Sequence, residues 1–349
     1  MGNMKVAVMT DIGRIGFTER PVPSPRPGEA LIKLEYVGIC GSDLHYFESG
    51  RIGNRIVKPP FVLGHEAGGV VAEVGEGVSH LKAGDRVALE PGKTCGRCVF
   101  CRTGMYNLCP DVRFFASPPI DGVFSEYAAH EAALCFPLPD NVTTMEGALI
   151  EPLSVGFHAA RQGGAQAGMS ALVTGAGCIG LVSLLALRAM GVSKVYVTDI
   201  EQKRLGKAIA LGAADVVNAR ERDPVDAVMS LTGGLGCDIV IEAAGTEVTT
   251  AQAVQIARRG GTVVCVGQSA GGSVNVPMTV AIMKELTFKT VFRYRHIYPI
   301  AIEAVASGAV NIKDVVTNVF AFDEIQSAFE QSLHNKADIV KSVIKISGD

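Results

Sequence analysis

The spacing of apolar residues changes partway along the chain. Up to about Pro152 the sequence consists of short β-like segments, such as residues 30–34 and 69–74, broken by Gly and Pro. These segments predict an irregular β-rich domain. From about Ser170, strand-like runs alternate with helical stretches, which predicts repeated βαβ units and a parallel sheet. We expect its strands at residues 170–174, 194–198, 215–218, 238–242, 262–266 and 286–291.

The regular alternation ends after about Phe292, where a helical stretch at residues 300–307 leads to a terminal strand at 339–346. We expect this tail to rejoin the β-rich domain. Residues 1–154 and 293–349 would then form one domain, with a second domain, residues 155–292, inserted between its two parts. Two domains also suit the length, because a single core rarely grows beyond about 250–300 residues.

Composition and charge narrow the class of protein. Hydrophobic residues make up 48% of the chain and charged residues 19%, which is typical of a soluble globular protein. The formal net charge is -3, and no run of Lys or Arg would neutralise nucleic acid or an anionic lipid surface, so we expect neither as a partner. The first residues lack a signal-peptide pattern, and residues 181–190 are too short to span a bilayer. We therefore expect a cytoplasmic protein without membrane contact.

A glycine-rich turn links the first strand of the predicted parallel sheet to an apolar helix. Residues 171–180 read ALVTGAGCIG, a strand followed by G-x-G-x-x-G. In this context Gly175 permits the tight turn, and Gly177 lets the backbone approach a pyrophosphate. Gly180 lets the helix pack closely on the strand, with the phosphates at the helix N-terminus. The inserted domain is therefore predicted to bind a dinucleotide, although a glycine turn that binds no nucleotide is the alternative interpretation.

An acidic residue closes the next predicted strand. Asp199 follows the turn by about 20 residues, where a carboxylate would meet the adenosine ribose hydroxyls. Because this carboxylate would repel a 2′-phosphate, NAD is favoured over NADP. Lys203 and Arg204 lie nearby and would soften that preference if they face the cofactor. The expected cofactor contacts beyond the three glycines and Asp199 are Ile179, Arg204 and Val266.

Four cysteines fall in one short segment with the spacing C-x2-C-x2-C-x7-C, namely Cys95, Cys98, Cys101 and Cys109. In a reducing compartment, cysteines at such spacing are candidate metal ligands rather than disulfides. Four thiolates complete the tetrahedral coordination of zinc, which predicts a closed structural site. An iron–sulfur cluster is the rival, but the bacterial cluster motif has three residues rather than seven before its last cysteine.

A second candidate metal site is dispersed along the chain. Cys40, His65, Glu66 and Glu151 offer sulfur, nitrogen and oxygen ligands. Three or four such ligands with one position left for water or substrate describe a catalytic zinc site. Taken singly, each of these residues has an ordinary structural explanation.

The order of these motifs resembles that of the zinc-dependent medium-chain alcohol dehydrogenases. Residues 64–78 match G-H-E-x2-G-x5-G-x2-V, and the cysteine segment and the glycine turn follow in the family's order. The resemblance covers essentially the whole chain. It extends to the sorbitol and xylitol dehydrogenases through the segments GSDLHY at 41–46, GRIGN at 50–54, EPLSVG at 151–156 and VFRY at 291–294.

The resemblance implies a fold, a reaction and an assembly. The fold would be α/β, with a Rossmann doubly wound parallel sheet in the NAD-binding domain beside a β-rich, GroES-like catalytic domain. The reaction would be that of an L-iditol (sorbitol) 2-dehydrogenase, in which a secondary hydroxyl of a small polyol is oxidised to the ketose and a hydride passes to NAD. Each chain would hold one catalytic and one structural zinc ion, and the assembly would be a homotetramer.

The resemblance also assigns roles to particular residues. Cys40, His65 and either Glu151 or Glu66 would hold the catalytic zinc, directly or through water. Ser42 and His45 are candidates to carry the released proton to solvent. The expected substrate contacts are Tyr46, Phe114, Arg293 and Tyr294, with Phe115 as a further pocket wall.

Several alternatives stay open. Arg293 could instead contact the cofactor or another subunit. The substrate could be another secondary alcohol or diol, of the threonine or butanediol type. A non-catalytic NAD-binding zinc scaffold is disfavoured because every candidate ligand is present, and a zinc-free reductase is disfavoured by Cys40 and the pair His65 and Glu66.

Overall fold

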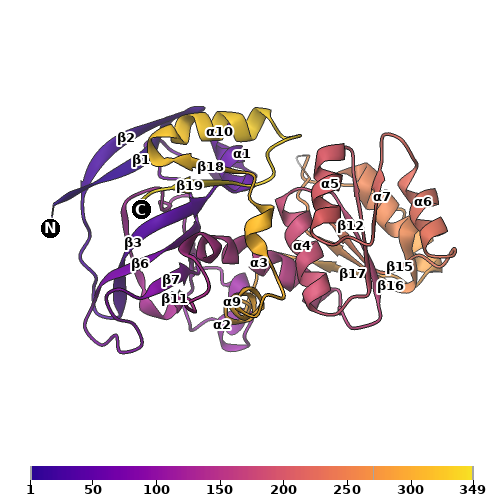
Figure 1. Cartoon of the computed structure of the whole chain (residues 1–349), viewed down its shortest axis with the longest axis horizontal. Helices are drawn as coiled ribbons and strands as arrows, with labels where there is room; N and C mark the ends of the chain where they lie inside the picture. Colours follow the sequence, from indigo (N-terminus) through magenta and orange to yellow (C-terminus); the bar gives the residue numbers. More distant parts are fainter. Residues whose placement is uncertain (1, 270, 348–349) are drawn as a thin grey trace. The chain divides into compact units, whose positions relative to one another are not determined.

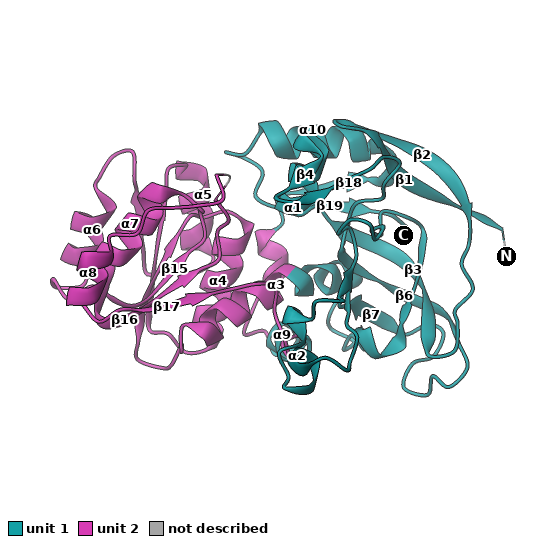
Figure 2. Ribbon diagram, turned by 180° about the vertical axis from the view of Figure 1, so that it is seen from behind, with its two compact units in different colours: residues 1–151, 298–307, 316–349 teal, residues 152–297, 308–315 magenta. Residues whose placement is uncertain are grey.

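The structure is a computed structural model that describes residues 2–269 and 271–347 (Figure 1). The described part of the chain forms two compact units, coloured separately in Figure 2. The first unit contains residues 1–151, 298–307 and 316–349, and the second contains residues 152–297 and 308–315. The domain boundaries that we expect from the sequence, after residues 154 and 292, stay a prediction.

The first unit is built around a mostly antiparallel sheet. Within the described residues this sheet has seven strands, in the order β11-β7-β6-β3-β19-β18, and β10 also pairs with β3. The β-like segments at 30–34 and 69–74 fall in β3 and β6, which pair with each other. The strands are β3 (Glu29–Gly38), β6 (Glu66–Val74), β7 (Arg86–Leu89), β10 (Tyr127–Glu131), β11 (Cys135–Pro137), β18 (Asn318–Ala321) and β19 (Ser342–Lys345).

Smaller elements surround this sheet. The hairpin of β1 (Asn3–Asp11) and β2 (Arg14–Pro21) and the short pairs β4 (Arg51–Ile52) with β5 (Arg55–Ile56) and β8 (Gly92–Lys93) with β9 (Arg113–Phe114) are separate ribbons. The helices of the unit are α1 (Gly41–Ser49), α2 (Val99–Arg102), the first part of α3 (Thr144–Gln162), α9 (Tyr298–Ala306) and α10 (Ile325–His334). Single 3-10 turns lie at η1 (Tyr106–Leu108), η2 (Ala132–Leu134) and η4 (Phe322–Glu324).

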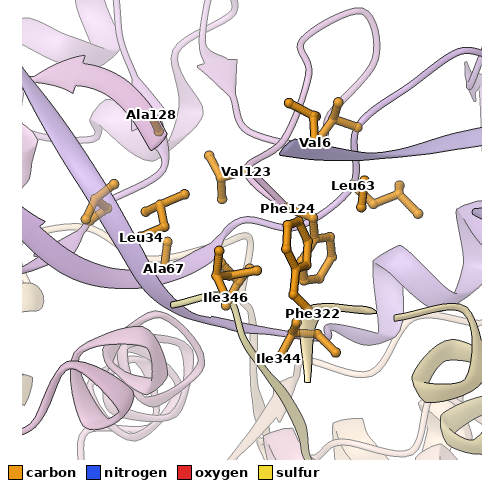
Figure 3. Close-up of a cluster of buried hydrophobic side chains, with 14 of the residues drawn as sticks. Val6, Leu34, Leu63, Ala67, Val123, Phe124, Ala128, Phe322, Ile344 and Ile346 are labelled. Atoms are coloured by element: carbon orange, nitrogen blue, oxygen red, sulfur yellow. The ribbon is translucent and has the colours of Figure 1, made fainter. Parts of the chain in front are cut away.

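The C-terminal tail completes the sheet and the core of the first unit. β19 pairs with β3 in antiparallel fashion and with β18 in parallel. Figure 3 shows Phe322 and Ile344 of the tail in the same buried cluster as Val6, Leu34 and Phe124. Because full burial of one such side chain contributes roughly 1.5–3 kcal/mol, the tail is an integral part of this core.

The structure corrects the sequence prediction in the tail. The helix expected at 300–307 is α9, but β18 and α10 were not predicted. The terminal strand expected at 339–346 is limited to β19, because the backbone N–H of Ile339 donates to Asn335 in the turn after α10. The backbone N–H groups of Val340 and Lys341 donate to the Thr317 side chain rather than to a neighbouring strand.

The second unit is a doubly wound α/β domain, so the predicted fold class is confirmed. Among its described residues the sheet has six parallel strands in the order β14-β13-β12-β15-β16-β17. This is the strand order 3-2-1-4-5-6 of the Rossmann fold. The elements are β12 (Ser170–Thr174), α4 (Cys178–Ala189), β13 (Lys194–Asp199), α5 (Gln202–Ala210), β14 (Asp215–Asn218), α6 (Pro224–Leu231), β15 (Cys237–Glu242), α7 (Glu247–Ile256), β16 (Ala257–Cys265), α8 (Met278–Met283), β17 (Thr287–Thr290) and η3 (Ile312–Val315).

One strand of this sheet starts earlier than the sequence predicts. β16 begins at Ala257 rather than at Thr262, because Ala257 already pairs with Cys237 before an irregularity in the register. The intervening residues read Arg-Arg-Gly-Gly, a polar and glycine-rich pattern that indicates a turn rather than a strand.

No helix in the ranges 2–269 and 271–347 is both long and apolar enough to cross a membrane.

Candidate metal and cofactor sites

A buried carboxylate organises the loop around Cys40. Cys40 is the N-cap of α1, and its backbone N–H donates to Asp43 Oδ2 at 3.0 Å. The backbone N–H of Gly64 donates to Asp43 Oδ1 at 3.0 Å, and the same oxygen lies 3.7 Å from His65 Nδ1. Asp43 has no exposed surface. The carboxylate therefore fixes two segments from different parts of the chain, and the sequence analysis did not assign it a role.

Cys40, His65 and Glu66 converge at this place. One ligand atom from each lies within 4.8 Å of the others. A tetrahedral zinc ion with ligands at about 2.0–2.3 Å requires donor atoms about 3.3–3.8 Å apart, so a small closure of this group accommodates the ion. Burial alone lowers the pKa of His65, but the Asp43 carboxylate and the Cys40 thiol raise it well above its usual value. Two negative groups next to an imidazole suit a divalent cation, so these residues fit zinc.

Glu66 also has a buried cationic partner. Lys341 Nζ forms an ion pair with Glu66 Oε2 and donates to the carbonyl of Ile39 at 3.0 Å. Both charged side chains are at most 2% exposed. A Cβ atom at Gly38 would overlap the Glu66 carboxylate, so a side chain at that point of β3 would displace Glu66 from this position. Lys341 therefore binds one carboxylate oxygen of Glu66 and leaves the other oxygen available as a metal ligand.

Glu151 lies outside the group of Cys40, His65 and Glu66. It is buried in α3, directly before Pro152. Glu90 is a second buried carboxyl close to Glu151. Burial raises the pKa of Glu90 to about 7, and the negative charge of Glu151 raises it further, whereas a hydrogen bond from Tyr106 lowers it. The Tyr106 hydroxyl donates to Glu90 Oε1 at 2.9 Å. Glu90 and Tyr106 are further buried polar residues that the sequence pattern did not single out.

The four cysteines of the predicted structural site form one compact lobe. Their sulfur atoms all lie within 4.8 Å of one another. Cys98 Sγ is 3.5 Å and Cys95 Sγ is 4.0 Å from Cys101 Sγ. Tetrahedral zinc with sulfur at about 2.3 Å requires sulfur atoms about 3.8 Å apart, so the lobe has the dimensions of a four-thiolate zinc site.

Backbone groups favour thiolates in this lobe. The N–H groups of Cys98 and Cys101 point at Cys95 Sγ and Cys98 Sγ, at 3.4 and 3.5 Å. Hydrogen bonds from the backbone of Arg97 and Cys98 lower the pKa of Cys95 to about 6, whereas burial raises the pKa of Cys109 to about 11. Metal binding at this lobe would therefore release protons.

The proposed proton carriers and part of the substrate wall lie in the same unit. Ser42 is half-buried and His45 is exposed, three residues apart on α1 and hence neighbours on one helix face. Tyr46 is buried on the same helix. The ring of Phe114 lies 5.5 Å from that of His65, whereas Phe115 packs against His130 instead.

The glycine turn of the second unit shows a different requirement at each glycine. Gly175 has a φ of +91°, which glycine adopts readily. A Cβ atom at Gly180 would overlap the carbonyl oxygen of Gly175, so the helix packs against the turn without space for a side chain. A Cβ atom at Gly177 would meet only Arg204 Nη1, at 3.9 Å. The backbone at Gly177 is thus open to a ligand, and the Arg204 side chain approaches it.

Asp199 is tied to this turn. Its Oδ2 accepts a hydrogen bond from the backbone N–H of Ala176 at 2.6 Å, and its Oδ1 accepts one from Glu201 at 2.8 Å. The carboxylate therefore orders the turn as well as closing β13. Ile179 is in the first turn of α4, and Val266 follows β16, with its N–H donating to Glu242.

The loop after β15 is organised by a carboxylate that the sequence analysis missed. Glu242 Oε1 accepts from the backbone N–H groups of Ala244 and Gly245 at 3.0 and 2.9 Å, and from Thr249 Oγ1 at 2.8 Å. Glu242 is buried at the carboxyl end of its strand. Ligands of open α/β sheets bind at this edge, so Glu242 shapes a loop next to the predicted cofactor site.

Arg293 and Tyr294 lie in the second unit, after β17. Arg293 has a φ of +56°, a left-handed conformation that is uncommon for residues other than glycine. Its guanidinium carbon lies 4.9 Å from the centre of the Phe292 ring, and Tyr294 is buried. His296 also has a positive φ. Strained backbone of this kind clusters at functional sites and costs of order 1–3 kcal/mol per residue.

Comparison with known proteins agrees with these observations. Residues 26–140 match the family model of the alcohol dehydrogenase GroES-like domain, and residues 178–307 match that of the zinc-binding dehydrogenases. Sorbitol dehydrogenase of Macaca fascicularis is 48% identical over 320 residues, which cover 91% of this chain and 89% of that protein.

Solved structures are similar over nearly the whole chain. A crystal structure of an Escherichia coli oxidoreductase/dehydrogenase of unknown specificity has a TM-score of 0.95 and 42% identity, covering 99% of this chain and 100% of that one. A zinc-binding dehydrogenase from Sinorhizobium meliloti, solved with bound NADP, has a TM-score of 0.92 and 30% identity, with coverage of 99% and 100%.

Proposed function

Since the chain belongs to the zinc-dependent medium-chain alcohol dehydrogenase family, we propose that it oxidises a secondary hydroxyl of a small polyol, such as sorbitol or xylitol, to the ketose, with NAD as the hydride acceptor. The protein is an oxidoreductase that uses zinc and a nicotinamide cofactor. The observation that carries the proposal is the convergence of Cys40, His65 and Glu66 on one buried point. The likeness to sorbitol dehydrogenase supports the choice of a polyol.

The residues at and around this point would bind the zinc ion, orient its ligands and balance their charge. Cys40, His65 and Glu66 would bind the catalytic zinc, and Glu151 would reach it through water. A bound zinc ion lowers the pKa of an alcohol hydroxyl, and the nicotinamide takes up the hydride. Asp43 orients Cys40 and His65, and Lys341 offsets part of the negative charge that Glu66 brings to the site.

The proton of the alcohol needs a route to solvent. Ser42 is half-buried at the start of α1, and His45 is exposed on the same helix face. The Ser42 hydroxyl can accept a proton from the substrate side while donating its own towards His45. An imidazole suits the outer position because one of its ring nitrogens can accept a proton while the other releases one.

Turnover of a panel of alcohols tests the proposed function. NADH formation would be followed with sorbitol, xylitol, galactitol, threitol and 2-butanol at equal concentrations. We expect at least one polyol to be oxidised with a kcat/KM at least about tenfold above that of 2-butanol, a difference of about 1.4 kcal/mol in transition-state stabilisation. Preference for 2-butanol would identify a simple secondary-alcohol dehydrogenase, and no turnover of any of these alcohols would contradict the proposal.

Asp199 is predicted to set the choice of cofactor. The Asp199→Asn variant keeps an acceptor oxygen for the turn but loses the charge that repels a 2′-phosphate. We expect its ratio of kcat/KM with NAD to that with NADP to fall by at least about tenfold. Arg204, close to Gly177, would then assist NADP binding. An unchanged ratio would show that Asp199 orders the turn without facing the ribose.

Arg293 is predicted to select polyols over simple alcohols. A polyol brings several hydroxyls into a desolvated site, and each hydroxyl left without a partner costs about 1–3 kcal/mol. A guanidinium offers five donors for them. We expect Arg293→Met to lower kcat/KM for xylitol by at least about tenfold while leaving 2-butanol nearly unaffected. Equal losses with both substrates would assign Arg293 to the fold, the cofactor or a subunit contact.

The remaining expectations concern the structural zinc site, the number of chains in the assembly and the location of the protein in the cell. We propose that the cysteine lobe holds a structural zinc ion, as its sulfur spacing supports. The homotetramer and the cytoplasmic location stay predictions from the resemblance and from the sequence. Sedimentation of the purified protein would determine the number of chains in the assembly.

A further inference from the structure

A cavity opens at the amino-terminal edge of the parallel sheet in the second unit. Its volume is about 750 Å³. Ser170 and Lys194, the first residues of β12 and β13, line it together with Asp238 of β15 and Arg258 of β16. The glycine turn follows the opposite end of β12, roughly 13 Å away along the strand. The cavity is therefore separate from the predicted cofactor site.

The lining of the cavity is strongly cationic. Four cationic side chains, Lys194, Arg258, Arg259 and Lys284, line it together with one carboxylate, Asp238, which gives a formal charge of +3. The whole chain has a formal net charge of -3. Arg258 and Asp238 neutralise each other at 2.8 Å, which leaves three cations without a carboxylate partner in the lining.

Two of these three cations are held in place by neutral groups. Arg259 Nη1 donates to the carbonyl of Met283 at 2.8 Å. Lys284 Nζ donates to the carbonyls of Val254, Gln255 and Ala257, at 3.3, 2.5 and 2.9 Å, beside the C-terminus of α7, so its three N–H donors all have acceptors. Carbonyl groups orient these side chains but do not neutralise them. Burial lowers the pKa of Lys284, and the charge of Arg259 lowers it further, which reflects the concentration of positive charge here.

Lys194 is the third cation. Its side chain forms no hydrogen bond or ion pair within residues 2–269 and 271–347, and it is exposed at the start of β13. The C-terminal ends of α6 and α7 also meet this edge, each with about half an elementary negative charge. The formal charge of +3 exceeds both together. Asp215, opposite the lining residue Tyr196 in the sheet, adds one further negative charge nearby. The side-chain charge around the cavity therefore stays positive and favours an anionic ligand.

One wall of the cavity is apolar. Leu231 and Leu235 line it and are 37% and 75% exposed, and Tyr196 and Met229 lie beside them. Leu235 belongs to the glycine-rich turn at residues 232–236, which follows α6. A ligand with an apolar body would cover these side chains, whereas inorganic phosphate would leave most of the cavity unfilled.

We propose that this cavity is a second ligand site that binds an organic phosphate monoester, in which a dianionic phosphate meets Lys194 and Arg259, the charge of Lys284 adds to the attraction, and an apolar or ring-shaped body lies on the leucine wall. A phosphate dianion suits three cations better than a single carboxylate does. The site is distinct from the residues assigned to catalysis and to the cofactor.

Calorimetric titration of the full-length protein, saturated with NAD, tests this site. NAD saturation keeps the probes out of the cofactor site. Phenyl phosphate is the probe, and inorganic phosphate and phenol are its two halves. We expect phenyl phosphate to bind at least about tenfold more tightly than inorganic phosphate, and phenol not to bind measurably. Equal affinity for phenyl phosphate and inorganic phosphate would overturn the role of the apolar wall.

Variants determine where the probe binds. Lys194→Gln and Arg259→Gln should each weaken phenyl phosphate binding by at least about fivefold, because each removes one cation from the cavity. Lys289→Gln removes the same charge from β17 of the same unit, outside the cavity lining, and should leave the affinity unchanged. Cys40→Ser should also leave it unchanged, which separates this site from the catalytic metal site.

Three results would overturn the proposal. These are no binding of phenyl phosphate to the wild-type protein, equal weakening by Lys194→Gln and Lys289→Gln, or loss of binding in Cys40→Ser.

Discussion

Replacing Cys40 with serine is expected to abolish polyol oxidation while leaving a folded protein that binds NAD. The thiolate is lost as a zinc ligand, but serine is a good N-cap, and the backbone N–H that donates to Asp43 remains. We expect kcat/KM to fall by at least about 1,000-fold, which corresponds to about 4 kcal/mol. NADH formation measures the loss, and calorimetry with NAD measures the retained binding.

Cys98→Ser is the matched variant in the other metal site. It makes the same chemical change in a closed lobe, where metal binding is coupled to local folding. We expect a lower melting temperature and loss of the lobe's zinc as the primary effects. If Cys40→Ser kept its turnover, or if it unfolded as Cys98→Ser does, the assignment of Cys40 to a catalytic site would be wrong.

Removing the Asp43 carboxylate is expected to damage both the fold and the metal site. In Asp43→Ala the part-buried N–H of Cys40 and the buried N–H of Gly64 lose their acceptor, at about 1–3 kcal/mol each. We expect the free energy of unfolding to fall by about 3 kcal/mol. We also expect zinc affinity to fall about 10–100-fold, as is typical when a group that orients metal ligands is lost.

The control for Asp43 is on the same helix. Glu48→Ala removes an exposed carboxylate from α1 and should change neither stability nor zinc affinity measurably. Chemical denaturation and competition with a zinc chelator provide the two readouts. Unchanged zinc affinity in Asp43→Ala would show that the carboxylate supports the loop but not the metal ligands.

The parts of the molecule that the sequence predicted are those with local geometry. The glycine turn is recognisable from the sequence because its three glycines lie within six residues and each has its own structural reason. Gly175 has a positive φ, and Gly180 packs too closely against the turn for a side chain. The cysteine lobe was recognised because all four ligands lie on 15 consecutive residues, 95 to 109. In both cases the spacing along the chain almost determines the arrangement in space.

The convergence of Cys40, His65 and Glu66 is not local. It depends on the pairing of β3 with β6, which sets Gly38 opposite Glu66. Before the structure, only the family resemblance brought these residues together. Lys341 was missed for the same reason, because it lies 275 residues from Glu66 and reaches it only when the tail joins the sheet. Nothing near Lys341 in the sequence marks it as the partner of a buried acid.

Some features that we did not predict are nevertheless marked by a pattern in the sequence. The buried residues of α10, Ile325, Ala328, Phe329 and Ser332, follow the i, i+3, i+4, i+7 spacing of an amphipathic helix. Asp43 stands three residues after Cys40, at the position where an N3 carboxylate caps a helix. Glu90 and Tyr106 offered no such signal, because their hydrogen bond depends on how the cysteine lobe packs.

Elemental analysis of the purified protein tests the proposed zinc chemistry most directly. Metal content would be measured per chain for the wild type and for Cys40→Ser after dialysis against a metal-free buffer. We predict two zinc ions per chain in the wild type and one in the variant, because the cysteine lobe keeps its ion. One zinc ion per chain in the wild type, or iron in place of zinc, would contradict the assignment of a catalytic and a structural zinc site.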